Sequence, residues 1–403
     1  MLCSLIGNCS ILILSKACLK IANCQTLNNE YFYRTNINYI MEINEIVSYL
    51  ESLAPIKSQE VWDNCGVQTG DVTLDCTGII VALDCTEAIV LEAISKGCNL
   101  VITHHPLIFK GLKQITGKNY VERTLLLAIK NDITLYAIHT NFDVWRFGVN
   151  HEIANRLNLI DQRVFVPSTE SLVKVEVYVP IENKSEVQEA MFEAGAGKVG
   201  DYSDCSFQTA GLGTFVPNAS AKPFIGEAGV TEEVNEVKIE VIVANNSLNA
   251  VLKAMLSAHP YEEVAHHIIP TLNKNNYQGL GMIGTFETAK TVEEFLILVK
   301  KTFGGTLRYT GNIENKIKTI ALCGGSGASF ISNAKASKVD AYLTADVKYH
   351  EFFDAENALL LVDIGHFESE QFTSHRIVSL LTEKFTNFAV HLTDTNTNPI
   401  KYF

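Results

Sequence analysis

The sequence predicts an α/β protein with a parallel-type sheet and flanking helices, interrupted by a small ferredoxin-like α+β insert domain. Two observations support this fold class. Strand-like and helix-like segments alternate in both halves of the chain, and a similar strand–helix unit occurs twice between the halves. Alternation of this kind is typical of a parallel sheet covered by helices.

The first alternating region follows an amphipathic helix that is expected over residues 43–53. Residues 77–84 form a continuous apolar run, which predicts a buried strand. Residues 86–97 have helical spacing and end at a glycine, as many helices do. The pattern then continues with a strand at 99–103, a helix at 121–132 and a strand at 133–139.

The middle of the chain has a different pattern of apolar and polar residues. Residues 173–180 alternate between apolar and polar side chains, as a half-buried strand does, and a helix is expected over 184–195. After glycine-rich turns, the unit recurs as a strand at 237–244 and a helix at 247–258. Two such units predict a small ferredoxin-like domain.

The α/β alternation resumes near residue 286, and the middle region is therefore interpreted as an insert. The expected elements of the second half are a helix at 291–303, strands at 317–323, 339–344 and 358–364, and a final helix at about 368–385. The predicted division is a leader at 1–40, a first metal-binding half at 41–169, the insert at 170–285 and a second metal-binding half at 286–403.

The first 40 residues do not fit this plan. Residues 5–14 are apolar but too short to span a bilayer, and no Lys or Arg precedes them as a signal sequence requires. We expect the ordered protein to begin near Met41, with residues 1–40 a disordered leader or a non-native extension. An export signal is the alternative. No other segment reaches membrane-spanning length, so no membrane partner is expected.

Charge and cysteine content narrow the classes of function. The net charge of −13 disfavours generic nucleic acid binding, because an acidic surface repels phosphates. The ten cysteines include no CxxC pair, which is a poor pattern for disulfides or zinc fingers and indicates a reducing cytoplasm. Cys65, Cys85 and Cys323 lie beside apolar runs and are interpreted as packing residues.

Metal-capable side chains follow three of the predicted strands. One strand leads into His104 and His105, the next into His139 and Asp143, and a third into His366 and, four residues later, Glu370. Ligands of open α/β sheets bind beyond the carboxyl ends of strands, so we expect the three clusters to share one rim. Imidazole and carboxylate together suit Zn, Fe or Mn.

A structural role is the alternative for each histidine taken alone. The pair His266 and His267 illustrates this, because it lies within a strand-like segment without a carboxylate cluster and is interpreted as structural. The hypothesis of a metal site rests on three separate strand ends that each carry suitable side chains, rather than on any one histidine pair.

Several long motifs, in order along the chain, resemble the Nif-three-like family, whose members often carry the name GTP cyclohydrolase 1 type 2 homolog. The resemblance covers nearly everything from Met41 to Phe403, and the insert resembles that of the longer members. The motifs are VWDNCGVQTGD (61–71), VITHHPLIFKG (101–111), HTNFD (139–143), CSFQTAGLGTF (205–215), KPFIGEAG (222–229), HPYEEVA (259–265), CGGSGASF (323–330), TADVKYHEF (344–352) and DIGHFESEQF (363–372).

The resemblance implies a dinuclear metal centre. Its ligands fall on His104, His105, Asp143, His366 and Glu370, with Glu370 as the bridging carboxylate. His139 is not a standard ligand and is assigned to proton transfer or to orienting the site. The chain departs from the family's pattern at residues 144–150, where many members have small residues and glycine, and this alters the implied pocket wall.

The resemblance also implies a toroidal homohexamer whose metal sites face an internal cavity. The insert resembles the trimer-forming PII and CutA-like modules. Neither the hexamer nor the cavity follows from spacing or periodicity in this chain.

Other motifs remain open at the level of sequence. The glycine-rich turn at 324–327 could hold an anion, although such a turn is more often only tight backbone. Further candidates, each with a plain structural alternative as a cap or turn, are Asp346 and His350, Asp63 and Asn64, and Tyr261, Glu262 and Glu263.

Two metal ions held by histidines and carboxylates usually activate water for hydrolysis. The first hypothesis is a metal-dependent hydrolase that acts on a nucleotide-like or phosphorylated small molecule, with two divalent ions per chain, zinc first and iron or manganese as alternatives. The second is a non-enzymatic metal-handling or regulatory hexamer whose insert senses a ligand. An open coordination position beside an anion-binding pocket favours the first, and a closed metal pair favours the second.

Overall fold

The computed structural model describes residues 41–169, 172–200 and 202–402. The expectations about a leader at residues 1–40 lie outside these described residues. The mixed α/β fold that the sequence predicts is confirmed, with helices packed on several sheets. Among the described residues, no helix is long and apolar enough to cross a membrane.

A five-stranded sheet combines four strands from the first half of the chain with the C-terminal strand β15, in the order β1-β4-β3-β2-β15. Strands β2, β3, β4 and β15 are parallel, and β1 is antiparallel to β4. The elements of this region are α1 (Ile43–Leu53), η1 (Ile56–Ser58), β1 (Gly66–Thr69), β2 (Ile79–Ala82), α2 (Glu87–Lys96), β3 (Leu100–Thr103), α3 (Tyr120–Lys130), β4 (Thr134–Ala137), α4 (Thr140–Val144), α5 (Val149–Arg156), α11 (Thr373–Lys384) and β15 (Val390–Leu392).

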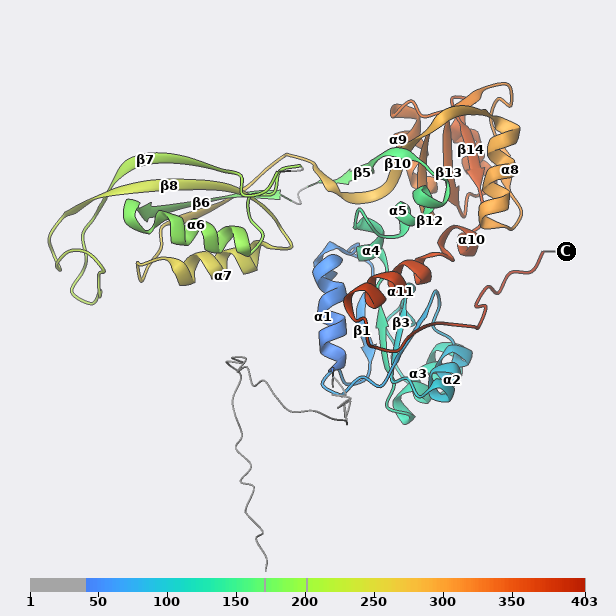
Figure 1. The fold of residues 1–403 in the computed structure, drawn as a ribbon, viewed down its shortest axis with the longest axis horizontal. Coiled ribbons are helices and arrows are strands. Elements are labelled where there is room, and N and C mark those ends of the chain that lie inside the picture. Colours follow the sequence, from blue (N-terminus) through green and yellow to red (C-terminus); the bar gives the residue numbers. More distant parts are fainter. Residues whose placement is uncertain (1–40, 170–171, 201, 403) are drawn as a thin grey trace, which may run out of the picture. The chain divides into compact units, whose positions relative to one another are not determined.

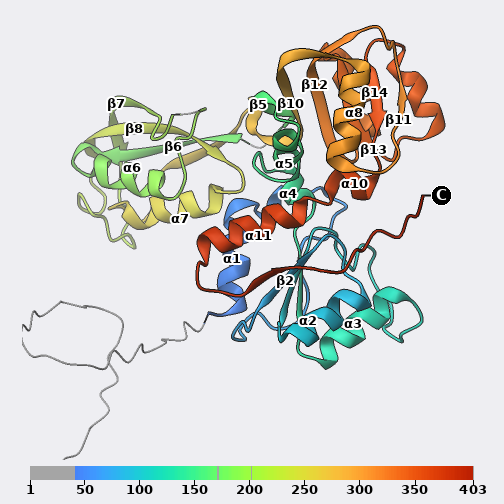
Figure 2. The same ribbon diagram turned by 45° about the vertical axis from the view of Figure 1, so that its right-hand side comes forward.

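Helices cover both faces of this sheet (Figures 1 and 2). Because side chains alternate along a strand, Ile80 and Ala82 of β2 pack with α2 and α3, whereas Ile79 and Val81 pack in the core that contains α1 and α11. Strand β2 is buried on both faces, as the continuous apolar run at 77–84 predicts.

A second, six-stranded sheet has the order β11-β14-β13-β12-β10-β5. Strands β12, β13 and β14 are parallel, and β5, β10 and β11 join them as antiparallel strands. The elements are β5 (Ile160–Ser168), β10 (Asn275–Thr291), α8 (Val292–Phe303), β11 (Arg308–Thr310), β12 (Lys316–Ser326), η3 (Ala328–Phe330), α9 (Ile331–Ala336), β13 (Ala341–Ala345), η4 (Tyr349–Ala355), β14 (Leu360–Asp363) and α10 (His366–Glu370).

The two sheets share one hydrophobic core. Ile79 and Leu100 of the first sheet belong to the same buried cluster as Ile320 and Val362 of the second. The other face of the six-stranded sheet packs on α9 and η4, where Tyr342 is fully buried. The final helix expected at 368–385 is in fact two helices, α10 and α11, separated at Gln371 and Phe372.

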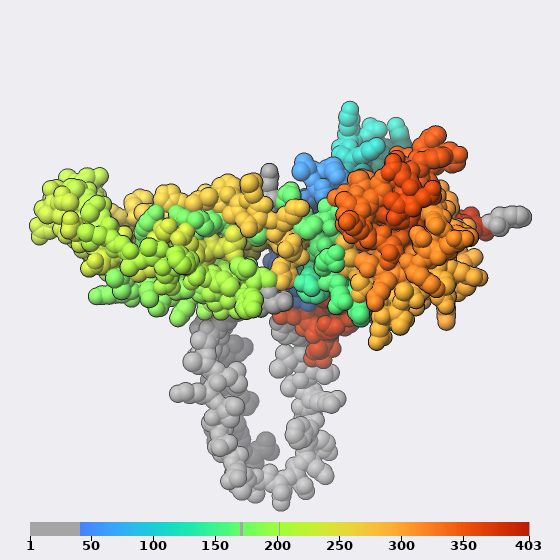
Figure 3. All heavy atoms as spheres, turned by 90° about the horizontal axis from the view of Figure 1, so that it is seen from above, coloured from blue at the N-terminus to red at the C-terminus, as the bar shows by residue number. Residues whose placement is uncertain are grey.

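The middle of the chain folds as a four-stranded antiparallel sheet with the order β7-β8-β6-β9. Helices α6 and α7 pack on one face, where Val187, Met191, Val251 and Met255 are buried. Figure 3 shows residues of the β7 region, in yellow-green, at the molecular surface. The elements are β6 (Leu172–Pro180), η2 (Ile181–Asn183), α6 (Lys184–Glu193), β7 (Ser206–Phe215), β8 (Glu232–Ala244), α7 (Leu248–Ala258) and β9 (His266–Pro270).

Candidate metal centre

The end of β3 positions His104 and His105. Their backbone N–H groups donate to the carbonyls of Ala82 and Leu83, at 3.3 and 3.0 Å, and so continue the pairing of β3 with β2. His104 is fully buried. Both side chains therefore start from backbone held by the sheet rather than from a free loop.

The end of β4 turns directly into the short helix α4. His139 precedes the helix, and its carbonyl accepts a hydrogen bond at 3.1 Å from the N–H of Asp143. This single turn brings the Asp143 side chain back towards the ends of β3 and β4. Its carboxylate oxygen Oδ1 lies 3.7 Å from Nε2 of His104.

The end of β14 supplies the third cluster through Gly365. This glycine has a φ of 90°, in the left-handed region, and a Cβ there would lie 2.3 Å from the Glu368 carboxylate. The turn starts α10, on which His366 and Glu370 are four residues apart and share one face. Nε2 of His366 lies 3.1 Å from Oε2 of Glu370.

The buried Glu370 carboxylate lies at the centre of the three clusters. Its Oε2 is 3.0 Å from Nε2 of His105, and its Oε1 is 3.8 Å from Nε2 of His104. The structure thus brings all three strand ends together. The expectation of a single rim needs correction, because β3 and β4 belong to the five-stranded sheet and β14 to the six-stranded sheet.

Each of the three central histidines is oriented through its Nδ1 atom. The Nδ1–H of His104 donates to the carbonyl of Ile138 at 2.8 Å. The Nδ1–H of His105 donates to Asp84 at 2.8 Å, and that of His366 donates to Asp346 at 2.7 Å. Partners of this kind are what metal-ligating histidines use to fix ring orientation. All three Nε2 atoms consequently face the Glu370 carboxylate.

Two buried atoms in this cluster have no hydrogen-bond partner among the described residues, namely Nε2 of His104 and Oδ1 of Asp143. Buried polar atoms are normally paired, because an unpaired one loses its hydration without compensation. An imidazole lone pair facing a carboxylate oxygen 3.7 Å away is an arrangement that a cation between them would complete. The donor set therefore fits a divalent metal ion.

The pKa values of the histidines in the metal-free site also indicate a place for a cation. Burial lowers the pKa of His105, but hydrogen bonds to Asp84 and Glu370 outweigh it and raise that pKa to about 9. For His366, burial is likewise outweighed by the charge of Glu370 and by Asp346, and the pKa rises to about 11. The carboxylates thus attract protons where a cation could bind, and metal binding would have to displace those protons.

The two carboxylates of the cluster differ from each other. Burial, and then repulsion from Glu370, raise the pKa of Asp143 to about 7. Burial alone would raise the pKa of Glu370 as well, but the charge of His366 and hydrogen bonds from the histidines hold it well below its usual range. Glu370 is therefore the more firmly ionised carboxylate of the pair.

His139 lies next to this cluster and is held by a different carboxylate. Its Nδ1–H donates to Asp63 at 2.8 Å, and Asp63 also accepts from the backbone N–H of Thr140 at 3.0 Å. His139, His104 and His105 each offer one atom that could bind a metal ion, and these three atoms lie within 4.8 Å of one another. His139 thus adjoins the site without any contact to Glu370 that the structure records.

Comparison with known proteins identifies the family. A family model described as Duf34/NIF3 (NGG1p interacting factor 3) matches residues 41–399. The chain belongs to the NIF3 family. A relative from Bacillus subtilis, named GTP cyclohydrolase 1 type 2 homolog, is 36% identical over 364 residues, which are 89% of this chain and 98% of the relative.

Other relatives of this NIF3-family chain are similar over the same span. A protein with the same name from Halalkalibacterium halodurans is 38% identical over 363 residues, with 89% and 98% of the two chains covered. The crystal structure of a Bacillus cereus protein related to NIF3 has a TM-score of 0.79 and 37% identity, and covers 90% of this chain and all of that one.

The glycine-rich turn of this NIF3-family chain packs against the cluster. The N–H of Gly324 donates to Asn150 and that of Gly325 to Ser369, each at 2.9 Å, so both groups are already occupied. A Cβ on Gly325 would lie 2.3 Å from Oε1 of Glu370. The turn therefore allows the backbone to approach Glu370 closely. This agrees with the structural interpretation of the turn as tight backbone, rather than with an anion site.

The remaining sequence candidates divide between support and packing. Asp63 and Asp346 each orient a histidine, and Asn64 donates to the carbonyl of Ile108 at 2.7 Å. His350 instead stacks on Phe353, 6.4 Å between ring centroids. His266 and His267 lie at the start of β9, and Cys65, Cys85 and Cys323 are buried free thiols.

Asp84 is a supporting residue that the sequence analysis missed. It follows β2 at the carboxyl end of a buried strand and holds His105, and it also accepts a hydrogen bond from Thr397 at 2.6 Å. The signal was present, since a carboxylate ended the predicted strand at 77–84. It was overlooked because no histidine accompanies it.

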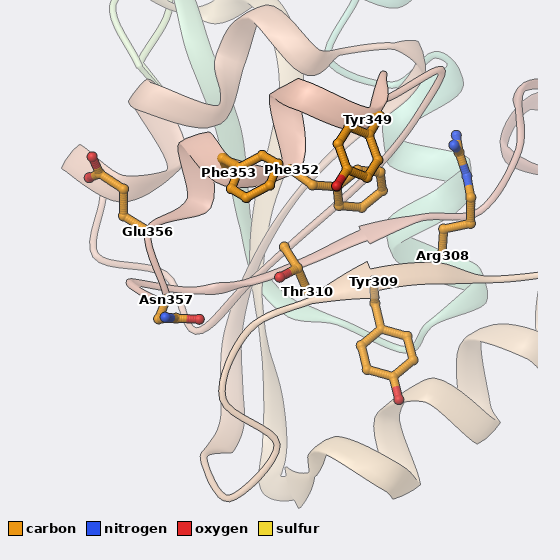
Figure 4. Close-up of a pocket in the computed structure, with 8 residues that line it drawn as sticks. All are labelled: Arg308, Tyr309, Thr310, Tyr349, Phe352, Phe353, Glu356 and Asn357. Carbon is orange, nitrogen blue, oxygen red and sulfur yellow. The ribbon is translucent and has the colours of Figure 1, made fainter.

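A groove of about 510 Å³ runs along η4 and β11 (Figure 4). Arg308 lies at one end and Asn357 at the other, with Tyr349 and Phe353 projecting from η4 between them. Arg308 donates to the carbonyl of Val347 at 3.0 Å and pairs with Asp363. Val347 directly follows Asp346, the partner of His366, so the Arg308 end adjoins the candidate metal centre.

Proposed function

We propose that this chain holds two divalent metal ions and acts as a metal-dependent hydrolase on a nucleotide-like or phosphorylated small molecule. One observation carries the proposal. Two sets of metal-capable residues, His105 with His366 and His104 with Asp143, are each completed by the same carboxylate, Glu370. A buried carboxylate shared by two such sets is suited to bridge two cations.

The five side chains supply imidazole nitrogen and carboxylate oxygen, which suits zinc first and iron or manganese as alternatives. A pair of such ions, when bound, activates water and neutralises the charge that develops during hydrolysis. The protein's own contribution is to hold the Nε2 atoms of the histidines towards Glu370 through Asp84, Asp346 and the Ile138 carbonyl.

His139 is proposed as the residue that moves a proton. Its Nδ1–H is committed to Asp63, so its Nε2 is the atom left to accept or give a proton. An imidazole oriented by a buried carboxylate in this way is the usual arrangement of a general base. The Asp63 carboxylate also accepts a hydrogen bond from the backbone N–H of Thr140. This bond holds the carboxylate in place, and the carboxylate in turn orients the His139 ring.

The site is open to solvent at its histidines. The side chains of His105 and His366 are 22% and 35% exposed, whereas that of Glu370 is 4% exposed. Near this opening, Trp62 packs 5.6 Å from Phe109 and 6.1 Å from His139, and both aromatic rings are about half exposed. An exposed aromatic pair beside the proton-transfer residue is suited to stack on a planar ring, which favours a nucleotide-like substrate.

The test is turnover by metal-defined protein. Chain stripped of metal and reloaded with zinc, iron or manganese is assayed against GTP, other nucleotides and p-nitrophenyl phosphate, and the His139→Gln variant serves as the control for adventitious activity. We expect metal-dependent hydrolysis of at least one of these compounds, and we expect the variant to lose most of this activity. Turnover that is absent with every metal, or unchanged in the variant, contradicts the proposal and favours a metal-handling protein.

We propose the insert as a separate domain that starts near the predicted residue 170 and ends near residue 274 rather than 285, because β10 (Asn275–Thr291) belongs to the six-stranded sheet. Its order β-α-β-β-α-β and its strand order are those of a ferredoxin-like unit. Ser168 of β5 pairs with Asn275 of β10, so a short glycine linker can replace residues 170–274. The shortened chain is expected to retain its metal, and loss of all metal from a folded deletion variant contradicts the division.

We propose, from the family resemblance, that the chain assembles as a homohexamer. The mass measured by light scattering on purified full-length chain tests this directly. A mass six times that of the 44.5 kDa chain is expected, and a monomer or dimer at micromolar concentration contradicts it.

A further inference from the structure

A second cavity lies entirely within the insert, at one end of its sheet. It has a volume of about 500 Å³, within the usual size of small-molecule sites. Its walls come from the end of β6, the end of β7, the start of β8, the loop between β7 and β8, and the segment before β9. No residue of the candidate metal centre lines it, so its chemistry can be considered independently.

Aromatic rings form much of the wall. The ring of Tyr261 lies 6.0 Å from that of Phe215 and 6.3 Å from that of Phe224, measured between centroids, and Tyr178 also lines the cavity. Phe224 is 58% exposed, so its apolar face is offered to whatever enters rather than buried against the insert's core. The faces of aromatic rings carry negative charge density and attract cations.

Carboxylates occupy the same cavity. The hydroxyl of Tyr261 donates to Glu236 at 3.0 Å, and Glu236 lies so close to β7 that a Cβ on Gly213 would be 2.2 Å from it. Glu262 accepts from the backbone N–H of Lys222 at 2.8 Å, which ties the β7–β8 loop to the opposite wall. Glu263 is the third lining carboxylate.

Positive charge is missing from this wall. None of the described residues that line the cavity is a lysine, arginine or histidine. Over residues 172–270 the sequence has six lysines, no arginine and fourteen Asp or Glu residues, so the surrounding field is negative too. A phosphate or a nucleotide would be repelled, and a positively charged ligand would be attracted.

The kind of cation follows from the rest of the lining. Calcium and magnesium require six or more oxygen ligands in close array, and a cavity walled by aromatic rings does not supply them. Zinc prefers imidazole or thiolate, which the described lining lacks. An organic ammonium ion needs only apolar and aromatic contact around its substituents and a carboxylate nearby.

We propose that this cavity is a binding site for a small organic ammonium ion. The rings of Phe215, Phe224 and Tyr261 surround the cationic group, and Glu236, held by the Tyr261 hydroxyl, provides the counter-charge. The site is separate from the proposed metal chemistry and does not depend on it.

The experiment uses full-length protein and a pair of probes that differ only in charge. Choline and its neutral isostere 3,3-dimethyl-1-butanol are titrated by calorimetry or by ligand-observed NMR, with tetramethylammonium and benzyltrimethylammonium as further cations. We expect saturable binding of one cation per chain, at least about tenfold tighter than the neutral isostere, because cation–π and carboxylate contacts both require the charge.

Variants locate the site. Phe224→Ala and Glu236→Gln are each expected to weaken cation binding by about tenfold. Phe207→Ala and Glu182→Gln are the matched controls, because they remove an exposed phenylalanine and an exposed carboxylate of the same insert that do not line the cavity. Thermal melting of each variant shows whether it remains folded, and Phe224, being exposed, should be replaceable without unfolding.

Several results would overturn the proposal. These are no saturable binding by any of the three cations, equal binding of choline and its neutral isostere, or equal losses in the cavity variants and their controls. Tighter binding of ATP than of choline would show an anion site instead. A change in oligomeric mass on Phe224→Ala, with choline binding unaffected, would show that a second copy of the chain covers these rings.

Discussion

The candidate metal centre and the insert cavity differ in what surrounds their carboxylates. In the candidate metal centre, Glu370 and Asp143 lie among imidazole nitrogens, and Glu370 is almost fully buried. In the insert, Glu236 lies among aromatic rings and beside open solvent. Carboxylate charge attracts a cation in both places, and the neighbouring groups decide which cation can be desolvated there.

The difference extends to the supporting bonds. Each central histidine of the metal centre is fixed by a separate acceptor from its own part of the fold, which gives lone pairs in fixed directions. In the insert cavity, the Tyr261 hydroxyl restrains Glu236 and one backbone N–H restrains Glu262. Directional ligands suit a metal ion, whereas an ammonium ion with apolar substituents needs shape and charge but little direction.

The strongest test of the metal side of this comparison is Glu370→Gln. The substitution keeps the size of the side chain but removes the shared negative charge from a buried position. We expect metal affinity to fall by at least about a hundredfold, with one or both ions lost, because an uncompensated charge in a buried site is costly. Metal content is measured by elemental analysis after reloading and desalting.

The matched control for Glu370 is Glu368→Gln on the same helix. Glu368 is equally buried, at 4% exposure against 3% for Glu370, but it does not belong to any of the metal-capable sets. Retention of full metal content in the Glu370 variant, or equal losses in both variants, would show that Glu370 does not bridge the ions.

A smaller effect is expected for His139→Gln. His139 contacts Asp63 rather than Glu370, and groups that support a metal site from outside its ligands typically change affinity or activity by about 10–100-fold. We expect two ions to remain bound and turnover to fall. Asp63→Asn should have a similar effect on the rate, since it disturbs the same ring. Loss of an ion from the His139 variant would make His139 a ligand, as its distance to His104 and His105 permits.

The metal-capable residues could be predicted because each one follows a buried apolar strand. Local sequence encodes that relation, and the structure brings His104, Asp143 and Glu370 together accordingly. The division into two sheets could not be predicted in the same way. Periodicity shows that 317–323 is a strand but not which strand pairs with it, and here its partners are β10 and β13.

The insert cavity shows a second limit of sequence reasoning. Tyr261 and Glu262 were noticed because they stand in one short motif, HPYEE. Phe215 and Phe224 lie within the motifs at 205–215 and 222–229, but neither they nor Glu236 could be grouped with Tyr261. Each lies 25 residues or more from Tyr261 along the chain, and sheet pairing and a long loop bring them to the cavity. When a site is assembled at the end of a sheet, local motifs do not show which of them meet there.

The pH dependence of ammonium binding sharpens the insert side of the comparison. His259 is buried, its Nε2–H donates to the Tyr178 carbonyl at 2.9 Å, and its Nδ1 accepts from the N–H of Tyr261 at 3.1 Å. Burial lowers the pKa of His259 below 6.5, against smaller raising effects of the Tyr178 carbonyl and Glu236. The folded insert thus binds this proton less readily than the unfolded chain, and its stability falls as the pH falls below 6.5.

Protonation of His259 also removes the acceptor for the Tyr261 N–H and so loosens one wall of the cavity. We expect choline affinity to fall by about fivefold between pH 7.5 and pH 5.5, the order of one hydrogen bond. The variant His259→Gln retains the carboxylates but not this titration, and its pH slope should be shallower. Equal slopes in the two proteins would assign the dependence to the carboxylates instead.

The smallest expected effect is the coupling between the insert cavity and the candidate metal centre. The insert cavity is lined by residues between Tyr178 and Ala265, and the metal-capable residues all lie outside that span. Zinc affinity should therefore change by less than about twofold when choline is saturating. Thermodynamic linkage requires that zinc change choline affinity by the same factor, so the two titrations check each other. A coupling of about tenfold or more, equal in both directions, would mean that the two sites bias a common two-state element. The insert would then act as a sensor for the metal centre. This result would favour the regulatory hypothesis over that of a hydrolase with an unrelated second site.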